Sequence, residues 1–151
     1  PLAHEKGIFD RALKFLLKLQ HGAPVRRYNW TMTVNPLLDT APETYPEWGH
    51  MRTALTQENM GHMMHLRVEL QTLYRLPRSN AICFDIRAYL GKFEELVTVP
   101  KWGRRLHRVV RDLHPDLAAY KGFIRNRDAM AQWLSQYDDG QPTSPGWWPE
   151  D

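Results

Sequence analysis

Polar side chains recur at alternate positions in three stretches of this sequence, and they are the residues best suited to chemistry. They are Arg27 and Asn29, then Arg67, Glu69 and Gln71, then Asp85, Arg87 and Tyr89. Because alternate residues of a β-strand point to the same side, each stretch predicts a strand with one polar side. Together they are expected to form a solvated sheet face with surface ion pairs, a covered polar network, or a site that binds an anionic group through planar arginine forks.

The second and third stretches predict a β-hairpin over residues 65–90. Apolar residues alternate with the polar ones on both arms, and residues 77–80, Pro-Arg-Ser-Asn, supply turn chemistry between them. If the even-numbered apolar side chains share one face, the loop holds an odd number of residues, three or five. The three-residue loop sets Glu69 opposite Arg87 and is favoured over the five-residue loop, because opposite charges across a strand pair attract.

Three amphipathic helices and one more strand complete the predicted fold. Apolar residues spaced three or four apart predict helices over residues 8–20, 102–113 and 123–137. The sequence therefore predicts an α+β protein, with an antiparallel sheet of strands 25–34, 63–76 and 81–90 and flanking helices. One domain is expected over residues 1–137, and residues 138–151, rich in Pro, Gly and acidic residues, predict a flexible tail.

Composition narrows the class of protein. The 151 residues, 42% of them hydrophobic, suit one globular domain. A net charge of +3 with both signs interspersed indicates neither nucleic-acid nor membrane binding. The lone Cys83 excludes an intrachain disulfide, and no signal peptide or membrane span is visible, so a cytoplasmic protein is expected. Because the chain begins at Pro1 without Met, it is expected to be a fragment or a processed product.

Other motifs give weaker signals. His62 and His65 are three residues apart, but without cysteine partners or a carboxylate in register they are a poor metal site, and the metal-ligating residues stay unknown. Glycine-rich phosphate loops, nucleophile elbows and paired-cysteine sites are absent from the sequence. A basic stripe on the far side of the 102–113 helix is formed by Arg104, Arg108 and Arg111.

Four motifs, in order and spacing, resemble the haem-dependent oxidative N-demethylase α-subunit family over residues 5–137. They are Arg27-x-Asn29-Trp30; Arg67-x-Glu69 followed by Gln71, Thr72, Leu73, Arg75, Leu76, Pro77 and Ser79; Phe84-x-Ile86-Arg87-x-Tyr89; and Tyr120-Lys121-Gly122. Three positions depart from the family pattern, with Leu70 in place of Arg, Asn80 in place of Gly and Ala88 in place of Thr.

The resemblance implies a PAS-like fold that carries haem b, in a monooxygenase-type oxidoreductase that removes a methyl group from a small secondary amine such as dimethylamine. Members of the family are longer, so the chain is expected to be their C-terminal half, with the iron-ligating histidine upstream of Pro1; His4 is the nearest histidine that remains. The alternative is a non-catalytic PAS-like binding or interaction module.

The family motifs also suggest roles for particular residues. Arginines suit the two propionates, so Arg67, Arg75 and Arg87, with Arg27 behind them, are the cofactor-binding candidates. Glu69 and Tyr89 are candidates for orienting these arginines or relaying protons. Electrons are expected from a separate flavin and iron–sulfur partner, which the basic stripe Arg104, Arg108 and Arg111 could dock.

Overall fold

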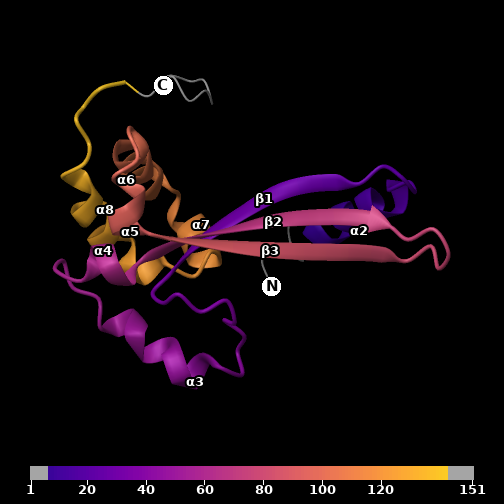
Figure 1. The fold of residues 1–151 in the computed structure, drawn as a ribbon, viewed down its shortest axis with the longest axis horizontal. Coiled ribbons are helices and arrows are strands. Elements are labelled where there is room, and N and C mark those ends of the chain that lie inside the picture. Colours follow the sequence, from indigo (N-terminus) through magenta and orange to yellow (C-terminus); the bar gives the residue numbers. More distant parts are fainter. Residues whose placement is uncertain (1–6, 143–151) are drawn as a thin grey trace. The chain divides into compact units, whose positions relative to one another are not determined.

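The computed structural model describes residues 7–142 of the chain (Figure 1). These residues form two compact units. The first unit comprises residues up to Asn29 together with residues 69–88, and the second comprises residues 30–68 and those from Tyr89 onward. Each strand of the sheet contributes residues to both units.

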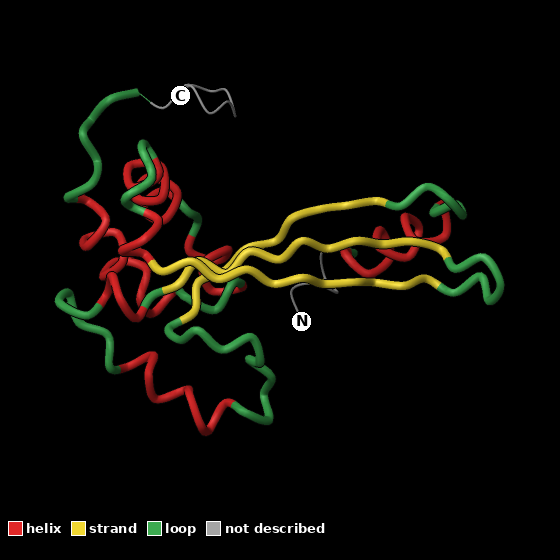
Figure 2. The backbone as a smooth tube through the Cα atoms, viewed as in Figure 1, coloured by secondary structure: helices red, strands yellow, loops and turns green. Residues whose placement is uncertain are grey.

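The sheet has three strands in the order β1-β2-β3 (Figures 1 and 2). The strands are β1, Val25–Thr33; β2, His65–Arg75; and β3, Ile82–Lys92. All three were expected within two residues of their observed ends, and the predicted α+β class with an antiparallel sheet is confirmed. The PAS-like arrangement stays a prediction, because helices beside a short antiparallel sheet occur in many α+β folds.

The hairpin has a different register from the predicted one. The Leu76 N–H donates to the Ala81 carbonyl at 2.8 Å, and the Phe93 N–H donates to the Met64 carbonyl at 2.9 Å. Between these two bonds β2 and β3 have the same number of residues, so every step forward along β2 matches one step back along β3. The loop therefore holds four residues, 77–80, and the prediction of an odd number is wrong.

This register reverses the expected faces of β3. Asn80 takes the left-handed conformation at φ 59°, which asparagine tolerates better than most residues and which accommodates the four-residue loop. Glu69 then faces Ala88, so the predicted pairing of Glu69 with Arg87 is wrong. A shift of one residue moves a whole strand's polar set to the other face, so Asp85 and Arg87 do not share a face with Glu69.

A side-chain contact agrees with this register. Tyr74 and Cys83 are directly opposite each other, and a hydrogen bond that the Tyr74 hydroxyl donates to the Cys83 sulfur raises the pKa of Tyr74. Directly opposite positions are the ones whose side chains approach most closely across two strands.

The first unit also contains helix α2, Ile8–Lys18, the first of the described helices. It was expected over residues 8–20. The helix ends because Leu19 is extended, at ψ 129°, and Gly22 turns the chain in the left-handed region at φ 79°. No residue of α2 itself is fully buried, although Leu19, immediately after it, is 6% exposed.

The helices of the second unit surround one apolar core. They are α3, Tyr45–Trp48; α4, Met60–Met63; α5, Phe93–Leu96; α6, Trp102–Asp112; α7, Pro115–Tyr120; and α8, Arg127–Ser135, with 3-10 turns at Gly49–Thr53 and Ile124–Asn126. Phe93, Met60, Val110, Met130 and Leu134 are fully buried there. Within residues 7–142, no helix has the length and apolar character that crossing a membrane requires.

Two of these helices correct the predictions. The helix expected over residues 123–137 begins only at Arg127, because a 3-10 turn precedes it. Helix α7 was not predicted, although its start carries a local signal: Pro115 lies at the first helical position, and the His114 side chain accepts a hydrogen bond from the Asp116 N–H.

Candidate functional site

Side-chain hydrogen bonds join polar residues of β1 and β2 into one row in the first unit. Arg27 Nε donates to Gln71 Oε1 at 2.6 Å. Asn29 Nδ2 donates to Glu69 Oε2 at 3.2 Å, and Gln71 Nε2 donates to the same oxygen at 2.9 Å. Gln71 is only 4% exposed, whereas Arg27 is exposed. The buried amide therefore links Glu69 to Arg27 and fixes the direction of the arginine's Nε.

An apolar pocket with a volume of about 450 Å³ lies between α2 and the strands of the same unit. Its lining consists of apolar side chains and two arginines: Ile8, Arg11, Ala12, Phe15, Leu16, Val25, Arg27, Leu73 and Phe84. Pockets for small molecules and cofactors have volumes of roughly 300–1,000 Å³ and are mostly apolar with a few polar groups. Arg27 connects the two features, because it lines the pocket and ends the polar row.

Arg75 holds α2 in place over this pocket. Its Nε donates to the Leu19 carbonyl at 2.7 Å and its Nη2 to the Leu16 carbonyl at 3.0 Å. These carbonyls belong to the C-terminal turn of α2 and the residue after it, where helices leave acceptors without a full set of backbone donors; the Leu16 carbonyl also accepts from the Leu19 N–H at 3.2 Å. Its Nη1 donates to the Asn80 carbonyl at 2.8 Å. All three guanidinium nitrogens of Arg75 therefore bond to the chain itself.

The other predicted site residues lie elsewhere. Arg67 belongs to the second unit, where its Nη1 donates to the carbonyls of Leu37 at 3.3 Å and Leu38 at 3.0 Å. Tyr89, also of the second unit, is 51% exposed. Arg87 is exposed, and its side chain lies on the other face of the sheet from Glu69. Of the six predicted residues, the structure thus brings Arg27 and Glu69 into one bonded row.

Three polar residues of the site, Asn29, Gln71 and Arg11, were not among the predicted site residues. Gln71 was recognised as part of the polar strand pattern, but its linking role depends on the β1–β2 pairing. Arg11 lies on the helix predicted over residues 8–20, and its side chain lines the pocket. Its position three residues after Ile8 was the available signal, because side chains three apart share a helix face.

The pocket lining can be compared with the needs of haem. Haem requires apolar walls, cations for its propionates and an axial ligand, which proteins supply from His, Cys, Met or Tyr. Arg11, Arg27 and the apolar side chains satisfy the first two needs. None of the four ligand types lines the pocket, and residues 7–142 contain no cluster of three or more His, Cys, Asp and Glu side chains placed to hold a metal. His4 lies outside the described residues.

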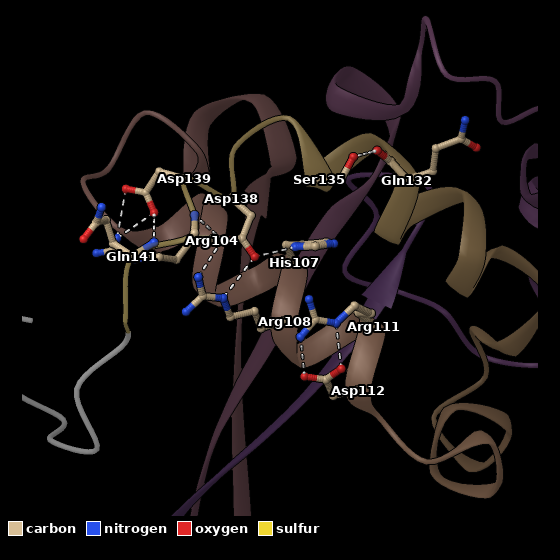
Figure 3. A network of polar contacts seen from close by, with 11 residues as sticks. Arg104, His107, Arg108, Arg111, Asp112, Gln132, Ser135, Asp138, Asp139 and Gln141 are labelled. Atoms are coloured by element: carbon tan, nitrogen blue, oxygen red, sulfur yellow. Dashed lines mark hydrogen bonds and ion pairs between the residues drawn. The ribbon is translucent and has the colours of Figure 1, made fainter.

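The predicted basic stripe forms a closed ion-pair network in the second unit (Figure 3). Arg104 Nη1 contacts both carboxylate oxygens of Asp139, at 2.7 and 2.9 Å. Arg108 donates to Asp138 through Nε at 3.0 Å and Nη2 at 2.6 Å, and His107 Nδ1 lies 2.8 Å from the same carboxylate. The first two residues of the predicted tail are therefore bonded to α6.

All three arginines of this stripe bond to carboxylates of the chain itself, and their docking of an electron-transfer partner stays a prediction. Arg104 is 7% exposed. The third arginine, Arg111, donates to the neighbouring Asp112 at 2.7 Å and 2.9 Å (Figure 3). The helical periodicity located the arginines correctly but could not show that acidic residues after α8 return to them.

Asp138 gives the second unit a predictable dependence on pH. The guanidinium of Arg108, and then His107, hold the pKa of Asp138 well below its usual range. An aspartate in the unfolded chain titrates at about pH 3.9. The stabilisation that ionised Asp138 gives the folded unit is therefore complete above that pH and is lost as the pH falls further. Urea unfolding is expected to show that Asp138→Asn lowers the midpoint at about pH 6 and has a smaller effect at about pH 3.

Asp128→Asn is the matched control, because Asp128 is exposed on α8. It is expected to lower the midpoint at about pH 6 much less than Asp138→Asn does, because an exposed carboxylate in the first turn of a helix contributes little. An equal loss from Asp138→Asn at the two pH values would show that the ionised carboxylate does not stabilise the unit.

The Tyr120-Lys121-Gly122 motif fastens the end of β1 within the second unit. Lys121 Nζ donates to the Trp30 carbonyl at 2.6 Å and lies 4.3 Å from the centre of the Trp30 ring. Thr31 Oγ1 donates in turn to the Lys121 carbonyl at 2.6 Å. Trp30 and Lys121, 91 residues apart in the chain, therefore bring two of the four sequence motifs together in space.

The comparison with protein families agrees with these motifs. A family model described as haem-dependent oxidative N-demethylase, alpha subunit-like, matches residues 2–131. The match does not bear out the expectation that the chain is the C-terminal half of its relatives. It covers most of the chain and includes every residue of the polar row, the pocket and the Tyr-Lys-Gly motif. The chain belongs to the haem-dependent oxidative N-demethylase alpha subunit-like family.

Proposed function

We propose that this chain supplies the apolar and cationic side of a haem site in an oxidoreductase that demethylates a small secondary amine such as dimethylamine. Family membership relates the chain to haem-dependent enzymes. The observation that carries the proposal is the pocket between α2 and the sheet, which combines apolar walls with Arg11 and Arg27. Haem b, when bound, supplies the redox chemistry.

The chain's own residues then have distinct tasks. Arg27 binds a carboxylate of the ligand through its terminal nitrogens, which have no protein acceptor within residues 7–142, while Gln71 holds its Nε. Glu69 acts as a positioning residue, because it anchors Gln71. Ile8, Phe15, Leu73 and Phe84 exclude water from the apolar part of the ligand. Arg75 keeps α2 over the pocket and does not bind the ligand.

The remaining components of the reaction come from outside the described residues. We place the axial ligand of the iron there, because no ligand-type side chain lines the pocket. Electrons come from a separate flavin and iron–sulfur protein, since the sequence has one cysteine and no dinucleotide fingerprint. A cytoplasmic location is part of the same proposal.

A second candidate function is a non-catalytic binding module for an apolar carboxylate. The observation that favours it is the same lining, which accommodates an apolar acid without iron ligation. The two candidates differ in one respect that can be measured, because only the first requires the bound cofactor to respond to an amine.

The visible spectrum tests the function directly. The protein, supplied with haem and purified, is expected to show a Soret band that shifts during titration with dimethylamine, because binding of the amine in the same pocket would change the surroundings of the haem. 2-Propanol, which has a similar size and no amine, is the control and is expected to leave the band unchanged. A haem spectrum that ignores small amines would defeat the substrate proposal, and a sample that retains no haem would favour the binding module.

A further inference from the structure

The outer edge of β3 offers unpaired backbone groups. β3 is hydrogen-bonded to β2 alone, so its other edge is open in the described part of the chain. Because Ala81 and Phe93 bond to β2, the odd-numbered residues of β3 direct their backbone groups toward β2. The even-numbered residues, from Ile82 to Leu90, therefore direct theirs outward, where another strand can pair with them.

The side chains along this edge protect it only through one acidic and one basic residue, which a partner strand can neutralise. Phe84 and Ile86 are 49% and 50% exposed on one face, and Asp85 and Arg87 are exposed on the other. Residues 82–88 contain no proline and no lysine, the residues that commonly block an open edge. In residues 7–142 neither Asp85 nor Arg87 has an ion-pair partner.

We propose that β3 pairs antiparallel with β3 of a second copy of this chain, with Ile86 on the two-fold axis. In this register Asp85 of each copy lies opposite Arg87 of the other, so two opposite-charge pairs form at once. The outward backbone groups of Ile86 meet their counterparts, as a hydrogen-bonded pair requires.

The charges select this register over its neighbours. To keep corresponding faces together, the pairing can shift only in steps of two residues. One such shift sets Asp85 against the partner's Asp85, and the opposite shift sets Arg87 against the partner's Arg87. Both place like charges directly across from each other, which is destabilising. On the other face the chosen register sets Phe84 against the partner's Ala88 and Ile86 against Ile86, which places apolar side chains of the two copies side by side.

Charge reversal tests the pairing without disturbing the fold, because both side chains are exposed. Sedimentation equilibrium of the 151-residue chain is expected to show a dimer. Asp85→Arg and Arg87→Asp should each raise the dissociation constant at least tenfold, and the double variant with both changes should restore it. Arg26→Asp on β1, the other edge strand, is the control and should have no effect. A wild-type chain that stays monomeric to its solubility limit, or a double variant as weak as the single ones, would overturn the proposal.

A crosslink tests the position of the axis. Cys83→Ser removes the only thiol and leaves a hydroxyl for Tyr74. In that background Ile86→Cys places two thiols on residues whose Cα atoms are about 5.5 Å apart, within the range for a disulfide. Phe84→Cys places them about 14 Å apart, from four residues at about 3.4 Å each. Mild oxidation should therefore crosslink only the Ile86→Cys chain, and equal crosslinking of the two variants would exclude this register.

Discussion

Replacing Arg75 by alanine is expected to lower the free energy of unfolding by about 3 kcal/mol, because hydrogen bonds to charged groups contribute about 1.5–3 kcal/mol. Arg75 bonds to carbonyls of Leu16, Leu19 and Asn80. Its removal takes this donor from all three, and Leu16 then keeps its bond from the Leu19 N–H. Urea unfolding followed by circular dichroism measures the loss, and amide exchange in α2 should accelerate.

Two controls separate the geometry of Arg75 from its charge. Arg75→Lys keeps the positive charge but lacks the planar fork, so it is expected to recover only part of the stability. Arg78→Ala removes an exposed arginine from the hairpin loop and should cost little. If Arg75→Ala cost no more than Arg78→Ala, Arg75 would not hold α2, and its predicted role as a carboxylate ligand would regain support.

Replacing Arg27 by alanine is expected to weaken haem binding about 10- to 100-fold. A charge-assisted hydrogen bond contributes about 1.5–3 kcal/mol, and each 1.4 kcal/mol corresponds to about tenfold in affinity. Titration with hemin, followed by absorbance, measures the change. Arg26→Ala is the control for the loss of a positive charge. Arg26 is the residue before Arg27 in β1, and successive residues of a strand point to opposite faces of the sheet.

Comparing the two arginine variants separates the effect of the pocket on hemin affinity from the effect of net charge. Arg26→Ala removes the same charge from the same strand and is expected to leave hemin affinity within a factor of about two, because an exposed charge away from the site changes little. Equal losses from Arg26→Ala and Arg27→Ala would mean that hemin responds to net charge rather than to the pocket.

Local patterns predicted the elements of this fold well and their pairing poorly. Periodicity placed β2 and α6 within two residues of their observed ends. The hairpin register failed because apolar residues of both arms were assigned to one face, whereas Leu73 and Phe84 line the pocket together. The left-handed Asn80 makes the four-residue loop possible, and a backbone angle of this kind is not encoded in hydrophobic alternation.

The sequence predicted those site residues whose position follows from the alternation within one strand. Arg27 and Glu69 were expected on polar strand faces, and the structure links them through Gln71. The contribution of Arg11 was not expected, because it depends on how α2 packs against the strands. Asp138 likewise appeared to begin a loose tail, and its contact with Arg108 spans 30 residues of sequence.

The position of bound haem tests the central claim most directly. Ferric haem is paramagnetic and broadens the signals of nearby nuclei, so an amide spectrum recorded during hemin titration locates it along the chain. The account predicts that the signals of Ala12, Leu16, Val25, Leu73 and Phe84, which line the pocket, disappear first. Loss centred on any other group of residues, or no loss at saturating hemin, would contradict it.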